Sequence, residues 1–235
     1  MPQRINEHGQ QIGPDVPAWT PRARPDQSPL TRQYAAVVRL DPAAHGDDLF
    51  AAFATDTSGA MWTYMPNGLF TEHAVFDAFM TEAKVSTDPL FYAIINKATG
   101  RAEGFASYLR IDPAAGTIEV GFIAMSPLLQ KTRVASEAIY LMMAHAMDDL
   151  GYRRYEWKCD NLNAPSKRAA GRYGFTAEGV FCQATMYKGR NRDTAWFSIL
   201  DSEWPAIKAG FVAWLDPANF DADGVQRAAL ETRTM

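Results

Sequence analysis

The chain has 235 residues, of which 47% are hydrophobic and 21% are charged, and its formal net charge is -4 at pH 7. This length can bury one substantial core, so we expect one folded domain with additional segments. No tract of like charges is present to form a nucleic-acid-binding face, which excludes nucleic acid as an expected partner.

The apolar residues are not arranged as a membrane-spanning or secretory segment. No run of about 18 apolar residues occurs, and the N-terminus lacks the apolar stretch of a signal peptide. The two cysteines, Cys159 and Cys182, have neither the spacing of a zinc site nor the density of a disulfide scaffold, and the histidines are scattered. We therefore expect a cytoplasmic protein that does not associate with a membrane and needs no metal.

Residues 1–33 are predicted to form a proline-rich N-terminal arm. They contain six of the 14 prolines, which lack a backbone donor and disfavour both helix and sheet. Trp19 lies within this arm, and a flexible arm gains nothing from an indole unless the ring docks on a surface. We expect it to dock on this subunit or on the partner of a homodimer. The folded domain is expected to span 34–215, followed by a polar tail at 216–235.

One strand and two helices are predicted directly after the arm. Residues 34–40 are β-branched and apolar and end at Asp-Pro, which is typical of a strand. Apolar residues recur at helical spacing within 47–53 and within 72–83, which predicts two amphipathic helices. The aromatic loop 61–66 between them either packs beneath a lid or forms a wall of an acceptor pocket.

An antiparallel meander follows, and then strands alternate with helices. Three strands are predicted at 90–95, 102–111 and 117–125, because short segments rich in turn formers separate them. The remaining elements are a helix at 133–150, a strand at 154–159, a helix at 165–173, strands at 177–187 and 193–200, and a helix at 205–215. The predicted fold is α+β (mixed α/β), with a mixed and mostly antiparallel sheet of about seven strands and helices on both faces.

The segment 123–138 runs from a strand through a tight loop into the long helix. Such a junction directs unpaired backbone N–H groups and the positive end of the helix dipole toward one point, which suits a phosphate. From Ala135 onward, small and apolar residues recur every three or four positions as a buried stripe. We expect Glu137, Tyr140 and Asp148 to face solvent instead.

Three motifs occur in order around this junction. Gln130-x-x-Arg133-x-Ala135 leads into Ser136-Glu137-Ala138, and Asn163-Ala164-Pro165-Ser166 is followed by Gly174-Phe175. Together they resemble the GNAT acetyltransferases, particularly the RimJ/RimL branch of ribosomal-protein N-terminal acetyltransferases. The resemblance is close over 119–204, and the predicted strand order extends it from about residue 34.

The resemblance implies a GNAT-type fold in which the fourth and fifth strands, ending at Met125 and near Lys158, splay apart to admit acetyl-CoA. Backbone groups of Ile123 and Met125 would pair with the pantetheine amides. The pyrophosphate would be held by Lys131, Arg133, Val134, Ala135 and Ser136. Arg133 stands where the family most often has glycine. Either its backbone is helical and its guanidinium reaches a CoA phosphate, or it is a solvated arginine.

The resemblance also implies catalytic roles. The equivalent serine of the family can protonate the departing thiolate, so Ser166 would be the general acid, and Asn163 would orient the pantetheine arm. Alternatively, Asn-Ala-Pro-Ser only begins a helix, with Asn163 as its cap. An amine must be neutral to attack, and Glu119 on the fourth strand or Glu156 on the fifth could serve as the base.

The predicted function is that of an acetyl-CoA-dependent N-acetyltransferase, which transfers acetyl to a primary amine by direct attack in a ternary complex. The acceptor would be a protein N-terminus or a small amine. The alternative is a non-catalytic acyl-CoA-binding or assembly module, motivated by Arg133 in place of glycine and by the lack of a base with diagnostic spacing. The basic turn 188–193 either meets an acidic partner or is a solvated hairpin tip.

Overall fold

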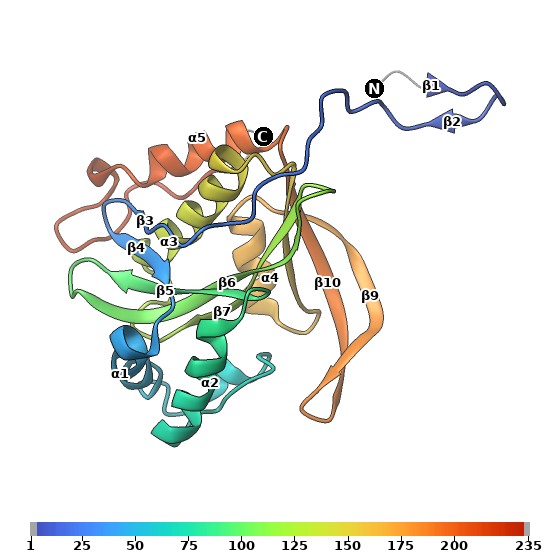
Figure 1. Cartoon of the computed structure of the whole chain (residues 1–235). Helices are drawn as coiled ribbons and strands as arrows, with labels where there is room; N and C mark the ends of the chain where they lie inside the picture. Colours follow the sequence, from blue (N-terminus) through green and yellow to red (C-terminus); the bar gives the residue numbers. More distant parts are fainter. Residues whose placement is uncertain (1–3, 233–235) are drawn as a thin grey trace.

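The computed structural model describes residues 4–232. Its main sheet has eight strands in the order β3-β4-β5-β6-β7-β8-β10-β9 (Figure 1). The strands are β3 (Leu30–Thr31), β4 (Ala35–Arg39), β5 (Leu90–Asn96), β6 (Arg101–Asp112), β7 (Thr117–Met125), β8 (Arg154–Asp160), β9 (Thr176–Tyr187) and β10 (Arg190–Leu200). The helices are α1 (Pro42–Phe53), α2 (His73–Val85), α3 (Arg133–Ala144), α4 (Ala164–Arg172) and α5 (Trp204–Trp214). The expected α+β fold is confirmed, with short β3 as an additional strand.

Tight turns join β5, β6 and β7 into the expected antiparallel meander. Gly100 and Gly116 close these turns with φ angles of 73° and 70°, a region that glycine enters at little cost. At Gly116 an added Cβ would also lie 2.3 Å from the indole of Trp19. The second turn therefore needs glycine both for its backbone and for the close approach of the arm.

The sheet opens between β7 and β8, its one parallel pair among the described strands. The two strands are paired from Thr117 with Arg154 to Val120 with Trp157, and the pairing ends there although both strands continue. Phe122 directly follows the last paired stretch with a φ of 46°, where the register with β6 also shifts. A β-bulge of this kind bends a strand and ends its pairing. The expected splay is confirmed, and the bulge is its local cause.

Helices cover both faces of the sheet, with α1 and α2 on one side and α3 and α5 on the other (Figure 1). Beneath α1 and α2, Phe53, Phe76 and Phe105 form an edge-to-face aromatic cluster. On the other face, Tyr108 donates to the carbonyl of Met142 at 2.6 Å and joins the sheet to α3. Each large apolar side chain buried in this way contributes about 2 kcal/mol to folding, so both faces of the sheet are firmly fixed.

Helix α3 differs from the prediction on its supposed solvent side. Glu137 is fully buried, and its carboxylate accepts the backbone N–H groups of Tyr34 and Ala35, the latter at 2.7 Å. Tyr140 is also buried and stacks on Phe211 of α5. The expectation that Glu137 and Tyr140 face solvent is therefore wrong, because β4 and α5 cover that side of the helix.

The end of the long helix is irregular. The α-helix stops at Ala144 and a π-helical turn, His145–Asp149, completes the span that was predicted as one helix. Asp148 is exposed as expected, and it accepts a hydrogen bond from the Trp204 indole at 2.8 Å. The wider turn still packs its apolar residues onto the sheet.

The arm docks on its own subunit. The Trp19 indole donates to the carbonyl of Ala114 at 2.7 Å, and the Arg22 guanidinium lies 4.3 Å from the ring centroid. Residues 30 and 31 then add to the sheet as β3. Before Trp19, a short hairpin of β1 (Arg4–Ile5) and β2 (Gln11–Ile12) projects from the body (Figure 1). The expected docking of Trp19 is thus confirmed in cis.

The segment after α5 folds back over the start of α3. The Trp214 indole donates to Gln226 at 2.8 Å, and Phe220 is buried beside Trp214. An added Cβ at Gly210 would lie 2.0 Å from the carbonyl oxygen of Glu231, so glycine lets this segment cross α5. The segment thereby becomes part of the wall around the loop before α3.

Candidate active site

A cleft of about 1630 Å³ opens where β7 and β8 diverge. It is bordered by the open ends of both strands, the start of α3, α4, the loop 61–66 and the β9–β10 hairpin. Among the residues expected at the site, Glu119, Ile123, Met125, Lys131, Arg133, Ala135, Ser136, Asn163 and Ser166 line the cleft. The side chain of Val134 does not line it and packs into the core instead.

The loop before α3 has free backbone donors. Thr132 caps the helix, since its hydroxyl accepts the Ala135 N–H at 3.1 Å and its carbonyl accepts the Ser136 N–H at 3.3 Å. Within residues 4–232, the N–H groups of Lys131, Arg133 and Val134 donate to no protein atom. Three free donors at a helix N-terminus suit an anion such as a diphosphate.

The bend that aims these donors falls at an unexpected residue. Lys131 has a φ of 62°, in the left-handed region, whereas Arg133 is the first residue of α3. The helical backbone expected for Arg133 is therefore confirmed, and glycine is not required there. The loop is fixed to β7 by the Gln130 side chain, which donates to the carbonyl of Met125 at 2.9 Å.

Arginines surround the free donors. The Arg133 guanidinium lies 4.4 Å from the Tyr34 ring centroid and forms no ion pair within the described chain. Arg172 on α4 donates to the Ser136 hydroxyl at 3.0 Å, and Arg168, one turn earlier, also lines the cleft. These residues fit the phosphates of acetyl-CoA, because unpaired guanidinium groups lie beside unpaired amides. Sequence reasoning missed Arg168 and Arg172, although their i, i+4 spacing after the Asn-x-x-Ser motif was a usable signal.

The open edge of β7 presents the backbone groups that were expected to pair with a ligand. The Ser126 N–H donates to Glu103 of β6, and the Ala124 carbonyl also points toward β6, where it would meet a Cβ at Gly104. Backbone groups alternate in direction along a strand. The peptide groups of Ile123 and Met125 therefore face the gap, apart from the Met125 carbonyl that holds Gln130.

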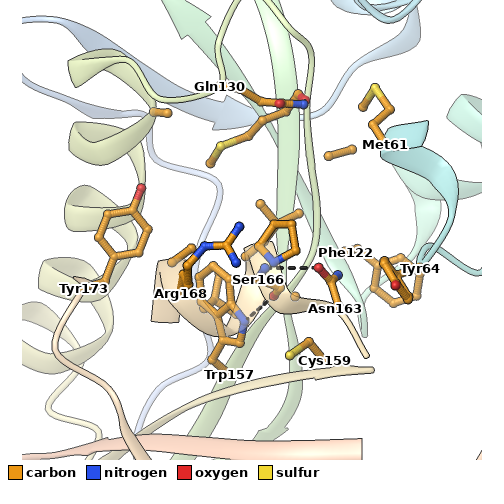
Figure 2. Close-up of a pocket in the computed structure, with 18 of the residues that line it drawn as sticks. Met61, Tyr64, Phe122, Gln130, Trp157, Cys159, Asn163, Ser166, Arg168 and Tyr173 are labelled. Carbon is orange, nitrogen blue, oxygen red and sulfur yellow. Dashed lines mark hydrogen bonds between the residues drawn. The ribbon is translucent and has the colours of Figure 1, made fainter. Parts of the chain in front are cut away.

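At the opposite lip of the gap, Asn163 and Ser166 begin α4 (Figure 2). Asn163 caps the helix by accepting the Ser166 N–H at 3.1 Å, and the Trp157 indole donates to the Ser166 hydroxyl oxygen at 2.9 Å. The indole thus occupies an acceptor site of the hydroxyl, which itself donates to the sulfur of the neighbouring Cys159. Burial raises the pKa of the neighbouring Cys159 thiol, which keeps this sulfur neutral. The expected helix cap at Asn163 is confirmed, and Ser166 lines the cleft as its expected role requires.

Two carboxylates flank the last paired residues of the open strands. Glu119 is 4% exposed, and its Oε2 lies 2.8 Å from Lys158 Nζ, which also contacts Glu156 at 2.7 Å. Burial raises the pKa of Glu119 above its usual range despite Lys158. Burial also acts on Glu156, but hydrogen bonds from Arg154 and Lys158 outweigh it and lower that pKa. Glu119 lines the cleft and Glu156 does not, so Glu119 is the better placed proton acceptor.

Sequence reasoning did not single out Lys158 as a site residue. Its ammonium is buried between the two carboxylates and lies 3.8 Å from the Trp196 ring centroid. The alternation of Glu156 and Lys158 on β8 placed both on one face, but their pairing with Glu119 depends on the strand register. Lys158 therefore fixes the position and charge of the candidate base.

The loop 61–66 forms the remaining wall of the cleft and also packs against the core. Trp62 is buried and packs edge-to-face on Phe53, whereas Met61, Tyr64 and others of the loop line the cleft (Figure 2). The β9–β10 turn rests on this loop, because Lys188 donates to the Trp62 carbonyl at 2.8 Å. The basic turn is solvated at its tip, where residues 188–191 are exposed, and it also contacts the body through Lys188.

Among residues 4–232, no group of three or more His, Cys, Asp and Glu side chains is arranged to hold a metal ion. In the same part of the chain, no helix combines the length and apolarity that crossing a membrane requires.

An opened parallel strand pair, with free loop amides after one strand and a capped helix after the other, defines an acyl-CoA-binding transferase of α+β fold. Residues 38–176 match the family model described as the acetyltransferase (GNAT) domain, and the chain belongs to this family. GNAT acetyltransferases use acetyl-CoA, and the chain therefore carries an N-acetyltransferase domain.

Known relatives agree with this assignment. A GCN5-related N-acetyltransferase from Brucella melitensis, known from a crystal structure, is 46% identical with a TM-score of 0.90, covering 92% of this chain and 97% of that one. An uncharacterized N-acetyltransferase, p20, of Bacillus licheniformis is 29% identical over 113 residues, which are 48% of this chain and 63% of that protein's length. The acetyl transferase of Salmonella typhimurium that modifies the N-terminal serine of ribosomal protein L7/L12 is 18% identical with a TM-score of 0.63, covering 74% of this chain and 99% of that one. At that identity the likeness is one of fold.

Proposed function

We propose that the chain transfers the acetyl group of acetyl-CoA directly to a primary amine in a ternary complex. One observation carries the proposal: the free loop donors at Lys131 and Arg133 and the pair Glu119 and Ser166 border one continuous cleft. Acetyl-CoA would supply the activated acyl group. The loop donors, together with Arg133 and Arg172, would bind its phosphates, while Ile123 and Met125 would bind the pantetheine amides.

In this proposal the protein's residues move two protons. Glu119 takes a proton from the acceptor ammonium, for which a raised pKa is suited because it brings the carboxylate closer to neutral pH. Ser166 gives a proton to the departing thiolate and takes back the second proton of the attacking nitrogen, while the Trp157 indole holds its oxygen in place. Asn163 holds Ser166 in place by capping α4.

The acceptor class and the cellular context are also proposals. The Asn163-to-Ser166 motif and the Gly174-Phe175 pair favour the RimJ/RimL-like branch, and therefore a protein N-terminus ahead of a small amine. We further propose a cytoplasmic enzyme that can form a homodimer. Its domain would span 34–215, between the arm 1–33 and the tail 216–235.

Calorimetry with acetyl-CoA followed by a thiol-release assay on a panel of amines and peptides tests the proposal. Binding together with acceptor-dependent thiol release is the expected result. Binding without release on any acceptor would favour a non-catalytic acyl-CoA-binding module. The helical backbone of Arg133 removes one motive for that alternative, because the missing glycine does not distort the loop.

A further inference from the structure

Three cationic side chains lie near the turn of the β9–β10 hairpin, and the one carboxylate beside them, Asp193, accepts hydrogen bonds from Gln183 and Asn191 instead. Lys188, Arg190 and Arg192 form no ion pair with a carboxylate of residues 4–232. Lys188 and Arg190 donate to the carbonyls of Trp62 and Thr63, each at 2.8 Å, and these neutral acceptors leave the charges uncompensated. Burial and the nearby Arg190 both lower the pKa of Lys188, which agrees with a locally positive field.

Arg192 brings this charge into the cleft. Its side chain is half-buried and lines the cleft, and its Nε is shielded from solvent without a hydrogen-bond acceptor in the described chain. Asp160, the cleft carboxylate on the neighbouring strand, instead accepts the Tyr187 hydroxyl at 2.7 Å and the Leu162 N–H at 2.8 Å. Buried polar groups nearly always have a partner, so an unpaired guanidinium in a cleft points to a ligand.

A second unpaired donor lies on the same face of β10. The Trp196 indole N–H is shielded from solvent and has no acceptor within the described residues. Alternation along β10 places Arg192, Thr194 and Trp196 on one face, and all three line the cleft. The two donors without acceptors in this row, Arg192 Nε and the Trp196 indole N–H, are complementary to a ligand that supplies acceptor oxygens.

The row begins beside the candidate base. Trp196 pairs with Lys158 across the β8–β10 ladder, and Lys158 contacts Glu119 at 2.8 Å. Arg192 lies four residues farther along β10, about 13 Å away at about 3.3 Å per residue. An extended peptide whose amine lies level with Trp196, beside Lys158 and Glu119, would therefore bring the side chain of its fourth or fifth residue to Arg192.

From these contacts we propose that the acceptor is an acidic peptide N-terminus, with a carboxylate at its fourth or fifth residue bound by Arg192 and with backbone oxygens facing the Trp196 indole. This inference rests on the proposed function only for the place of the amine. The basic turn is then the part of the enzyme that selects the acceptor, and lysine- or arginine-rich N-termini are disfavoured by the same charges.

The test compares two amidated pentapeptides that differ only in two aspartates or two asparagines at the fourth and fifth positions. Their dissociation constants are measured by calorimetry with the full chain saturated with CoA, and their kcat/KM values by thiol release. The aspartate peptide is expected to bind about tenfold more tightly, which is typical of a charge-assisted hydrogen bond. Arg192→Met should abolish this preference, and Arg192→Lys should restore part of it.

Arg101→Met is the matched control, because it removes the same charge from an exposed site near α1 and should keep the full preference. Equal binding of both peptides by the unmodified chain, or a preference that survives in a folded Arg192→Met variant, would overturn the inference. An absence of thiol release from every peptide would contradict the proposed function instead, while the binding ratio would still decide whether the cleft prefers an acidic peptide.

Discussion

Replacing Ala135 by glutamate should abolish useful binding of acetyl-CoA without unfolding the protein. Ala135 is 2% exposed and lines the cleft in the first turn of α3, so a longer side chain must extend into the space beside the free loop amides. A carboxylate about 5 Å from a phosphate charge costs about 3 kcal/mol at an effective permittivity of about 20. The dissociation constant should therefore rise by about two orders of magnitude.

The helix itself should tolerate the change. Thr132 is the cap, and glutamate three residues later completes a Thr-x-x-Glu capping box, which stabilises a helix start. Calorimetry with acetyl-CoA measures the affinity, and thermal unfolding checks the fold. Ala213→Glu adds the same charge at an exposed position of α5 and should bind normally. A folded Ala135→Glu variant with unchanged affinity would show that the phosphates bind elsewhere.

Three further predictions concern the base, the acid and the arm. Ser166→Ala should lower kcat more than it weakens acetyl-CoA binding. Thiol release measures kcat and calorimetry measures the affinity. An unchanged kcat would show that Ser166 serves only the start of the helix. Lys158→Met removes the cation that offsets the effect of burial on Glu119, so the pKa of Glu119 should rise further. Because a base works only when deprotonated, the acidic limb of the pH profile of kcat/KM should move to higher pH. A limb that stays in place would exclude Glu119 as the base. Trp19→Ala loses the indole hydrogen bond, worth about 1 kcal/mol, and the packing of a half-buried ring. A total loss of about 2 kcal/mol should lower the melting temperature by about 4–8 °C, and an unaltered melting curve would contradict the docking of the arm.

Local patterns were enough to predict the elements but not the contacts between distant segments. Strand and helix positions followed from periodicity and turn residues, and the family motifs brought Ser166 and the loop before α3 to one site. Glu137 was misplaced because its partners, the N–H groups of Tyr34 and Ala35, lie about a hundred positions away in the chain and leave no periodic signal. A carboxylate inside a helix pattern is usually solvated, and only the packing of β4 shows otherwise.

Within the candidate site, too, the sequence did not predict features that depend on contacts between distant segments. The backbone bends at Phe122 and Lys131 could not be predicted, since neither residue is glycine and a positive φ is uncommon in such residues. The role of Lys158 depends on the parallel register that sets Glu119 beside Glu156. Site residues that belong to a local sequence motif could therefore be predicted from the sequence. Site residues whose role depends on the register between strands could not.

The bulge at Phe122 gives the sheet an edge in its middle. Strand edges normally lie at the margin of a sheet, where their unpaired groups invite other polypeptides and favour aggregation. Here the unpaired stretch of β7 is recessed between two neighbours, so a whole strand of another protein cannot reach it, but a thin linear chain with amide groups can. The same hydrogen-bonding groups that are a hazard on an outer strand thus become selective for a narrow ligand.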